Sequence, residues 1–216
     1  MKYARPTSHR IDPNSGNMQG AGGHYEKRVK DLEGLYADSD AFTRLVQVDP
    51  DHVVYHVHEK RPEQVAGDLI FGTTWMEPGR VGDEFYMTRG HIHACANRPE
   101  TYYGESGSGL MLLESPEGET EILEISARVL VYVPPMWIHR SVNTGDTPLV
   151  MSFCYPSDSG QDYEIIANSG GMAKRIVADG GGWKAVDNAA YRPRSAEDIR
   201  RVLATADAPL PTPVDN

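Results

Sequence analysis

The stretch that decides the fold is Gly-His-Ile-His-Ala-Cys-Ala-Asn-Arg-Pro-Glu, residues 90–100. Side chains two residues apart on a strand point to the same face, so His91 and His93 are expected to lie side by side in one cavity. Two neutral imidazoles and the carboxylate of Glu100 form a facial ligand set that leaves coordination positions open for water or substrate. The stretch therefore predicts a metal site.

A second stretch further along the chain offers a fourth ligand. Residues 134–139 are Pro-Pro-Met-Trp-Ile-His, and Asn143 follows four residues later. A strand is expected to end at the two prolines, after which the chain turns and His139 comes back toward the cavity. Four ligands in two suitably spaced segments favour a metal site over chance histidines.

The spacing of two histidines is not enough by itself. His56-Val57-His58 has the same spacing on another expected strand, but no carboxylate and glycine follow it as they do after His93. We therefore interpret His56 and His58 as structural or edge histidines.

Short runs of β-branched and aromatic residues surround the two histidine stretches and alternate with turn sequences. Strands are expected at 52–58, 68–76, 101–105, 110–114, 119–125, 129–133 and 149–155. Turn-forming residues separate them, as in Ser-Gly-Ser-Gly at 106–109 and Ser-Pro-Glu-Gly at 115–118. Many short, evenly spaced strands predict an all-β sandwich or barrel rather than βαβ units.

The ends of the chain have a different character. Apolar residues spaced by three predict a short helix over 25–36, and a hairpin is expected from 174–178 and 183–187 around three glycines. A C-terminal helix is expected to begin at Ser195, with Asp198 completing a capping box. The predicted organisation is an extended segment over 1–23, a barrel domain over 24–188, and a helix with a flexible tail over 189–216.

The composition excludes several classes of partner. The 216-residue chain has a formal charge of −10 and a sequence pI of about 5.2, so nucleic acid and anionic membranes are not expected to bind it. No apolar run approaches the ~20 residues that span a bilayer, and residues 1–23 lack an apolar signal core. Binding of a phosphorylated metabolite is compatible with this negative net charge, because a local pocket can be positive on an acidic protein.

The chain has only two cysteines, Cys95 and Cys154, which is no disulfide framework and suits a cytoplasmic location. Cys95 shares the strand parity of His93, but a ligand role is disfavoured because a bulge must intervene before Glu100. Cys154 lies in an apolar run and is expected to be a small core residue.

Several stretches resemble a known family. Residues 90–107 match the first cupin motif, Gly-His-x-His, six residues, Glu, six residues, Gly; residues 134–143 resemble the second, with Met136 where glycine is frequent. Two further stretches are similar to the cupin-type glucose-6-phosphate isomerases first known from archaea. They are Gly-Thr-Thr at 72–74 and Pro-Gly-Arg-Val-Gly-Asp-Glu-Phe-Tyr-Met-Thr-Arg-Gly-His at 78–91. The resemblance covers roughly 53–188.

The resemblance implies a cupin jelly-roll β-barrel with short N- and C-terminal helices. It implies a metal-dependent aldose–ketose isomerase that interconverts glucose 6-phosphate and fructose 6-phosphate in glycolysis and gluconeogenesis. One divalent ion per subunit is expected, with Fe²⁺ first and Mn²⁺, Zn²⁺, Ni²⁺ or Co²⁺ as alternatives. A homodimer is expected because barrels of this kind expose sheet edges that pairing covers.

The resemblance also implies roles for individual residues. Glu100 is the candidate base, and the hydrogen is expected to move either as a proton through it or as a hydride between carbons. Tyr102 shares the strand parity of Glu100, and Tyr155 is placed to hydrogen-bond a sugar hydroxyl. The expected substrate-binding residues are Tyr55, Thr74, Thr88, Gly90 and Tyr163. Gln161 stands where the family often has histidine, and glutamine hydrogen-bonds but does not titrate.

Two other functions fit the same ligands. An iron cupin dioxygenase would use three histidines and a glutamate but would not need phosphate-binding residues. A non-catalytic sugar-binding cupin would keep the barrel, although such proteins often lose metal ligands. Mannose 6-phosphate is a further substrate candidate, because an enediolate loses the stereochemistry at C2.

Overall fold

The computed structural model describes residues 5–62 and 67–206, and strands dominate it. All seven strands expected from the sequence are present. They are β2 Val53–Lys60, β3 Leu69–Met76, β6 Glu100–Ser106, β7 Ser108–Glu114, β8 Thr120–Ser126, β9 Leu130–Val133 and β11 Leu149–Pro156. The prediction of an all-β fold is confirmed.

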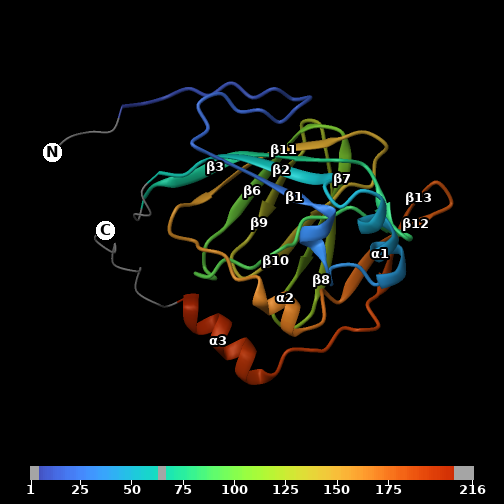
Figure 1. Cartoon of the computed structure of the whole chain (residues 1–216). Coiled ribbons are helices and arrows are strands. Elements are labelled where there is room, and N and C mark those ends of the chain that lie inside the picture. Colours follow the sequence, from blue (N-terminus) through green and yellow to red (C-terminus); the bar gives the residue numbers. More distant parts are fainter. Residues whose placement is uncertain (1–4, 63–66, 207–216) are drawn as a thin grey trace.

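The strands form three antiparallel sheets around a shared interior (Figure 1). The largest has six strands in the order β1-β2-β3-β11-β6-β9, with β1 at Gly23–Arg28. Facing it is a three-stranded sheet, β10-β7-β8, with β10 at Ile138–Val142. A smaller sheet, β13-β12-β5-β4, combines the predicted hairpin of β12 Lys174–Asp179 and β13 Gly182–Asp187 with β5 Glu84–Phe85 and β4 Arg80–Val81. Strands distant in sequence are therefore neighbours, as in a jelly roll.

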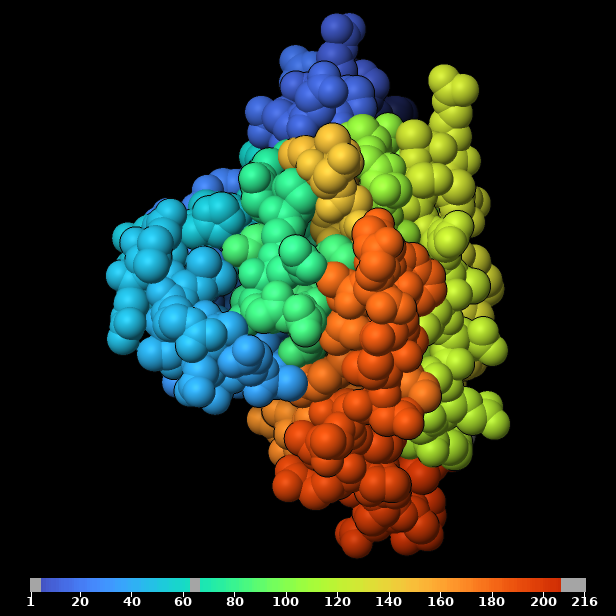
Figure 2. Space-filling model, turned by 90° about the vertical axis from the view of Figure 1, so that its right-hand side faces the viewer, coloured from blue at the N-terminus to red at the C-terminus, as the bar shows by residue number. Residues whose placement is uncertain are grey.

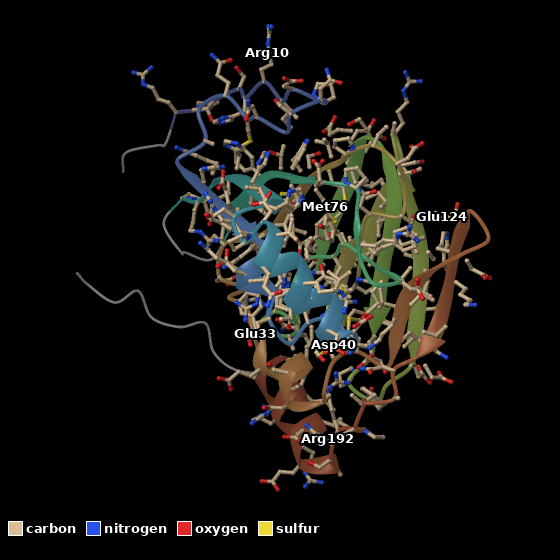
Figure 3. The ribbon with its side chains drawn as sticks, turned by 45° about the vertical axis from the view of Figure 1, so that its right-hand side comes forward. Arg10, Glu33, Asp40, Met76, Glu124 and Arg192 are labelled. Carbon is tan, nitrogen blue, oxygen red and sulfur yellow. The ribbon has the colours of Figure 1, made fainter. Side chains whose placement is uncertain are left out.

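The space between the two large sheets is filled mainly with apolar side chains. Met76, Met111, Leu149 and Met151 are 0% exposed and come from both large sheets. Figure 3 shows Met76 inside the molecule, whereas the labelled Glu124 of β8 lies at its outer surface. This core fixes the inner faces of the strands, and the cavity described below opens from it.

The prediction of a helix over residues 25–36 is wrong. Residues 23–28 form β1, which pairs with β2, and only Val29–Leu32 turn into a 3₁₀ helix, η1. The spacing of apolar residues marked Val29 and Leu32 as buried, but pairing along β2 determined the conformation of the residues before them. The helix in this region lies later, α1 at Ser39–Val48, where the Asp38 carboxylate accepts a hydrogen bond from the Ala41 N–H.

The predicted C-terminal helix is present as α3, Ala196–Ala206. Its capping box forms as expected, because the Asp198 N–H donates to Ser195 Oγ at 3.1 Å and the Ser195 N–H donates to the Asp198 carboxylate at 3.4 Å. The expected tail over 207–216 lies outside the described residues, and the division at 23 and 188 stays a prediction. No helix of the described residues is long and apolar enough to cross a membrane.

A buried ion pair attaches the C-terminal segment to the three-stranded sheet. Glu114 at the end of β7 is 0% exposed, and its Oε1 lies 2.7 Å from Nη1 of Arg194, which is also buried. The second carboxylate oxygen accepts the Ala173 N–H at 2.5 Å. Figure 2 shows the C-terminal part of the chain, orange to red, packed along the yellow-green strands that this pair joins to it.

Replacing Glu114 with alanine should strongly destabilise the protein, because it leaves the Arg194 guanidinium buried without its carboxylate. We expect the free energy of unfolding to fall by about 3–5 kcal/mol, measured by denaturant titration. Asp187→Ala is the matched control, since it breaks the exposed pair with Lys174 and should cost less than about 1 kcal/mol. Equal losses in the two variants would contradict the anchoring role of Glu114.

Candidate metal centre

Four side chains converge where β6 and β10 meet the segment before β6. His91 and His139 exchange two backbone hydrogen bonds, with N–H to O distances of 3.1 and 2.9 Å in the two directions. Glu100 begins β6, and His93 lies two residues beyond His91. One potential ligand atom from each of the four side chains lies within 4.8 Å of every other, so the structure brings all four predicted ligands together.

The carboxylate of Glu100 is the point on which the imidazoles converge. Its Oε2 lies 3.0 Å from Nε2 of His139, 3.3 Å from Nε2 of His93 and 4.0 Å from Nε2 of His91. None of the four residues is more than 9% exposed. The cluster is therefore a buried group of polar side chains at the edge of the apolar core.

Backbone carbonyls fix the orientation of two of the imidazoles. His93 Nδ1 donates to the Arg98 carbonyl at 2.8 Å, and His139 Nδ1 donates to the Trp137 carbonyl at 3.0 Å. In neutral rings, Nε2 then carries a lone pair and faces the cluster, which is the arrangement that outer hydrogen bonds impose on metal-binding histidines. The side chain of Arg98 is itself held by Asp158 through two bonds of 2.8 and 2.9 Å.

The electrostatics of the cluster fit a divalent cation. Two unprotonated Nε2 atoms would face a carboxylate at 3.0 and 3.3 Å, an arrangement that needs a positive charge among them. Among the described residues, Nε2 of His91 and of His93 are buried without a hydrogen-bond partner, and such orphaned atoms destabilise a protein. A metal ion would satisfy both requirements, so the cluster is able to hold one.

The protonation states agree with a ligand set. Burial, and then the neighbouring His139, hold the pKa of His91 well below its ordinary value, so the ring is neutral near pH 7. Burial opposes the charged form of Glu100, but contacts with His139 and His93 outweigh it and hold the pKa of that carboxyl well below its usual range. Neutral imidazoles and a carboxylate are the forms that bind metal.

A small cavity of about 60 Å³ lies over the cluster. The sequence-predicted residues that line it are Tyr55, Thr74, Thr88, Gly90, His91, Glu100, Tyr102, His139, Tyr155 and Tyr163. Tyr102 faces the cavity with Glu100, as strand parity requires, and His93 supports the cluster from behind. At Arg89, Gly90 and Tyr163 the cavity meets a larger surface groove of about 1010 Å³.

Gly90 is the residue that lets the chain turn into this cluster. Its φ is +71°, and a Cβ there would lie 2.9 Å from both the Cβ of Arg140 and the carbonyl oxygen of His139. Any larger residue would separate the segment from β10 and with it His91 from His139.

Several cavity residues were missed from the sequence. Tyr25 enters from β1, which was expected to be a helix, and no role was assigned to Arg140 or Phe153. Glu59 is a second carboxylate on the cavity wall, although Glu100 is the one carboxylate in the four-residue cluster. Its position two residues beyond Val57 on β2 was the available indication.

Glu59 is paired with a cation. Both of its carboxylate oxygens accept from the Arg61 guanidinium at 3.0 Å, and Arg61 also lies 3.4 Å from the Tyr155 hydroxyl.

The two cysteines do not belong to the cluster. Cys95 contacts Asn97 and Thr205, and Cys154 is half-buried on the outer face of β11, so the expectation of a core cysteine is wrong.

Comparison with known proteins gives a consistent result. The family model "Glucose-6-phosphate isomerase (GPI)" matches residues 26–194. The chain is 59% identical to the glucose-6-phosphate isomerase of Sinorhizobium medicae (strain WSM419), over 92% of this chain and 93% of the relative. It is 44% identical to that of Thermococcus gammatolerans, over 87% of this chain and 97% of the relative. A solved structure of oxalate oxidase with a substrate analogue is 15% identical and covers 51% of this chain and 55% of its own, with a TM-score of 0.43.

His139→Ala should abolish tight metal binding at the cluster. We expect the affinity for Mn²⁺ to fall by more than about 100-fold, because a directly bound imidazole contributes more than an outer hydrogen bond does. The measurement is Mn²⁺ retained after dialysis, determined by elemental analysis. His52→Ala, a histidine outside the cluster, is the control and should retain the ion. Unchanged Mn²⁺ content in His139→Ala would remove His139 from the ligand set.

Proposed function

Because the chain belongs to the glucose-6-phosphate isomerase family, we propose that its buried four-ligand cavity is where glucose 6-phosphate and fructose 6-phosphate interconvert. The observation that carries this proposal is the convergence of His91, His93 and His139 on Glu100 at the base of a cavity lined with hydroxyl groups. The chain is an aldose–ketose isomerase with a cupin fold, and the reaction is a step of glycolysis and gluconeogenesis.

The isomerase must move a hydrogen between C1 and C2 of an open-chain sugar phosphate. Removing a hydrogen from carbon is slow, and the negative charge that develops comes to lie on oxygen. A divalent ion held by the four ligands would supply a Lewis acid that stabilises this charge. We propose Fe²⁺ as that ion, with Mn²⁺, Zn²⁺, Ni²⁺ and Co²⁺ able to bind the same ligands.

Glu100 is the proposed base. It is ionised near pH 7, because its pKa lies well below its usual range, and it stands at the centre of the cluster. A low pKa also makes it a weak base, so transfer of the hydrogen as hydride between the two carbons remains the alternative route. Glu59 does not belong to the four-residue cluster, and both of its carboxylate oxygens are already paired with the Arg61 guanidinium.

Tyr102 and Tyr155 are the proposed hydrogen-bond donors to the sugar. Burial, followed by the charge of Glu100, raises the pKa of Tyr102 well above its usual value. Burial also raises the pKa of Tyr155. Both hydroxyls therefore keep their protons at physiological pH and can donate to substrate oxygens. A fixed neutral donor near a developing oxyanion stabilises it without a change in the donor's own charge.

The phosphate is proposed to bind at the end of the cavity where it meets the groove. Thr74, Thr88, Tyr55, Gly90 and Tyr163 line this cavity, and the guanidinium of Arg89 lies 4.7 Å from the centre of the Tyr163 ring. Hydroxyl groups and a cation suit a phosphate dianion. Ligand pockets of roughly 300–1,000 Å³ are usual, so a cavity of about 60 Å³ must open for a hexose phosphate to enter. Displacement of Arg89 from Tyr163 is the proposed opening movement.

These features favour the isomerase over the two other candidates. A dioxygenase acting on a thiol or diketone has no need for cations at the cavity mouth, and a sugar-binding cupin has no need for four intact ligands.

We further propose a homodimer that covers the free edge of β1, because unpaired sheet edges promote association. A cytoplasmic location is proposed from the two free cysteines.

Turnover should depend on both the metal and Glu100. In a coupled assay from fructose 6-phosphate, we expect chelator-treated protein to lose activity and to regain it with Fe²⁺ or Mn²⁺. Glu100→Gln should lower kcat by about 100-fold or more, the contribution of a positioned base. The C2 hydrogen is followed by starting from C2-deuterated glucose 6-phosphate. Complete retention of deuterium in the product, without solvent exchange, would exclude Glu100 as a solvent-exchanging base.

Arg89→Gln should weaken substrate binding more than it slows the reaction. Loss of one charge-assisted hydrogen bond to phosphate corresponds to a roughly 10- to 100-fold rise in KM, with little change in kcat. Arg80→Gln is the matched control, because Arg80 is an exposed arginine on β4 outside the cavity lining. An unchanged KM in Arg89→Gln would move the phosphate site away from this end of the cavity.

A further inference from the structure

A second cluster of histidines lies on the other side of the six-stranded sheet. His24 on β1 is the cross-strand partner of His58 on β2, and His56 stands two residues before His58. Along β2, Tyr55 and Val57 alternate with these two histidines and line the catalytic cavity. His56 and His58 therefore project from the opposite, outer face of the sheet. The two clusters are therefore separated by the thickness of the sheet.

The three rings are close enough to share an ion. His24 and His58 stack with ring centres 4.4 Å apart, and His56 lies 5.3 Å from His58 and 5.7 Å from His24. One nitrogen from each ring lies within 4.8 Å of the other two. We propose that His24, His56 and His58 form a second metal site, which binds a divalent transition-metal ion such as Zn²⁺, Ni²⁺ or Cu²⁺ independently of the catalytic centre.

The ligand type selects the class of ion. Three imidazole nitrogens without a carboxylate suit zinc, nickel and copper, whereas magnesium, calcium and manganese prefer oxygen ligands. His56 and His58 lie on the same face of β2, and His24 lies directly across from His58 on β1. The three residues present one nitrogen each from the same face of the sheet and leave the side toward solvent open. Glu26 is the cross-strand partner of His56, but its carboxylate is paired with the Arg28 guanidinium at 3.1 Å, so the three imidazoles alone define the site.

Two observations support a ligand role over simple ring packing. The His56 ring lies parallel to Trp75, with centres 5.0 Å apart, so its plane is fixed in advance. Its Nδ1 is buried and has no hydrogen-bond partner in the part of the chain that the structure describes, although a buried nitrogen normally requires one.

Occupation of this site would join β1 to β2. β1 is the edge strand of the sheet, and Tyr25, which follows His24, lines the catalytic cavity from it. An ion that links His24 to His56 and His58 would therefore hold the edge strand, and Tyr25 with it, against the cavity. The outer site acts on the stability of the cavity wall rather than on the reaction.

Zinc stoichiometry distinguishes the two sites. Chelator-treated wild-type protein is saturated with Zn²⁺, dialysed and analysed for metal. We expect two ions per chain in the wild type, one in His24→Ala, one in His139→Ala and none in the double variant. His52→Ala is the control and should keep two. His24 is exposed, so its replacement should leave the fold intact even where His58→Ala does not.

A second readout identifies the ligands. In the His139→Ala background, Cu²⁺ should give an electron paramagnetic resonance spectrum with nitrogen coupling, and Zn²⁺ should raise the thermal midpoint. Both effects should disappear when His24→Ala is added. One ion per chain in the wild type, or two ions persisting in His24→Ala, would overturn the proposal. A half-equivalent of extra Zn²⁺ would overturn it too, because it would indicate an ion bridging two chains.

Discussion

The paired backbone hydrogen bonds between His91 and His139 are the interaction on which the site depends. They join two segments that are far apart in sequence, and each segment carries members of the four-residue cluster that is able to hold a metal ion. Because the bonds are made by the backbone at the ligand positions themselves, the two rings are held in register, 4.5 Å apart, without reliance on flexible side chains. The positive φ of Gly90 and the carbonyls that orient the rings matter because they preserve this pairing. Backbone pairing therefore fixes the positions from which the two imidazoles would bind an ion, and fixed ligand positions favour tight and selective binding.

The alternation of side chains along β2 gives this one strand two chemical faces. Tyr55, Val57 and Glu59 face the catalytic cavity, whereas His56 and His58 face outward. A shift of the strand by one residue would exchange the two sets, placing imidazoles in the cavity and a tyrosine outside. The pairing of β2 with both β1 and β3 excludes that shift. Ions on the two sides of the sheet would thus depend on the same register, although they share no ligand.

The sequence predicted most of the strands and the whole metal cluster, because both depend on local spacing. Alternating residues placed Tyr102 beside Glu100, and the spacing of His91, His93 and Glu100 held once the chain folded. The features that the sequence did not predict depend on contacts between residues that are far apart in the chain. Residues 23–28 are polar and become a strand only through pairing with β2, so Tyr25 was not foreseen in the cavity. The three-histidine cluster was missed for the same reason, since His24 reaches it from that strand.

Arg140 is a buried cation in the wall of the cavity of this acidic protein. Its guanidinium is 5% exposed and donates to the Arg89 carbonyl at 2.7 Å and to the sulfur of Met87. It forms no ion pair among the described residues, and its Nε has no partner there. Burial, and then repulsion from Arg175, lower the pKa of Arg140 to about 10, so it stays charged near neutral pH. A buried cation without a carboxylate destabilises the free protein. If the phosphate binds beside Arg89 as proposed, the dianion would meet this buried charge in the same cavity, and binding would offset part of its cost.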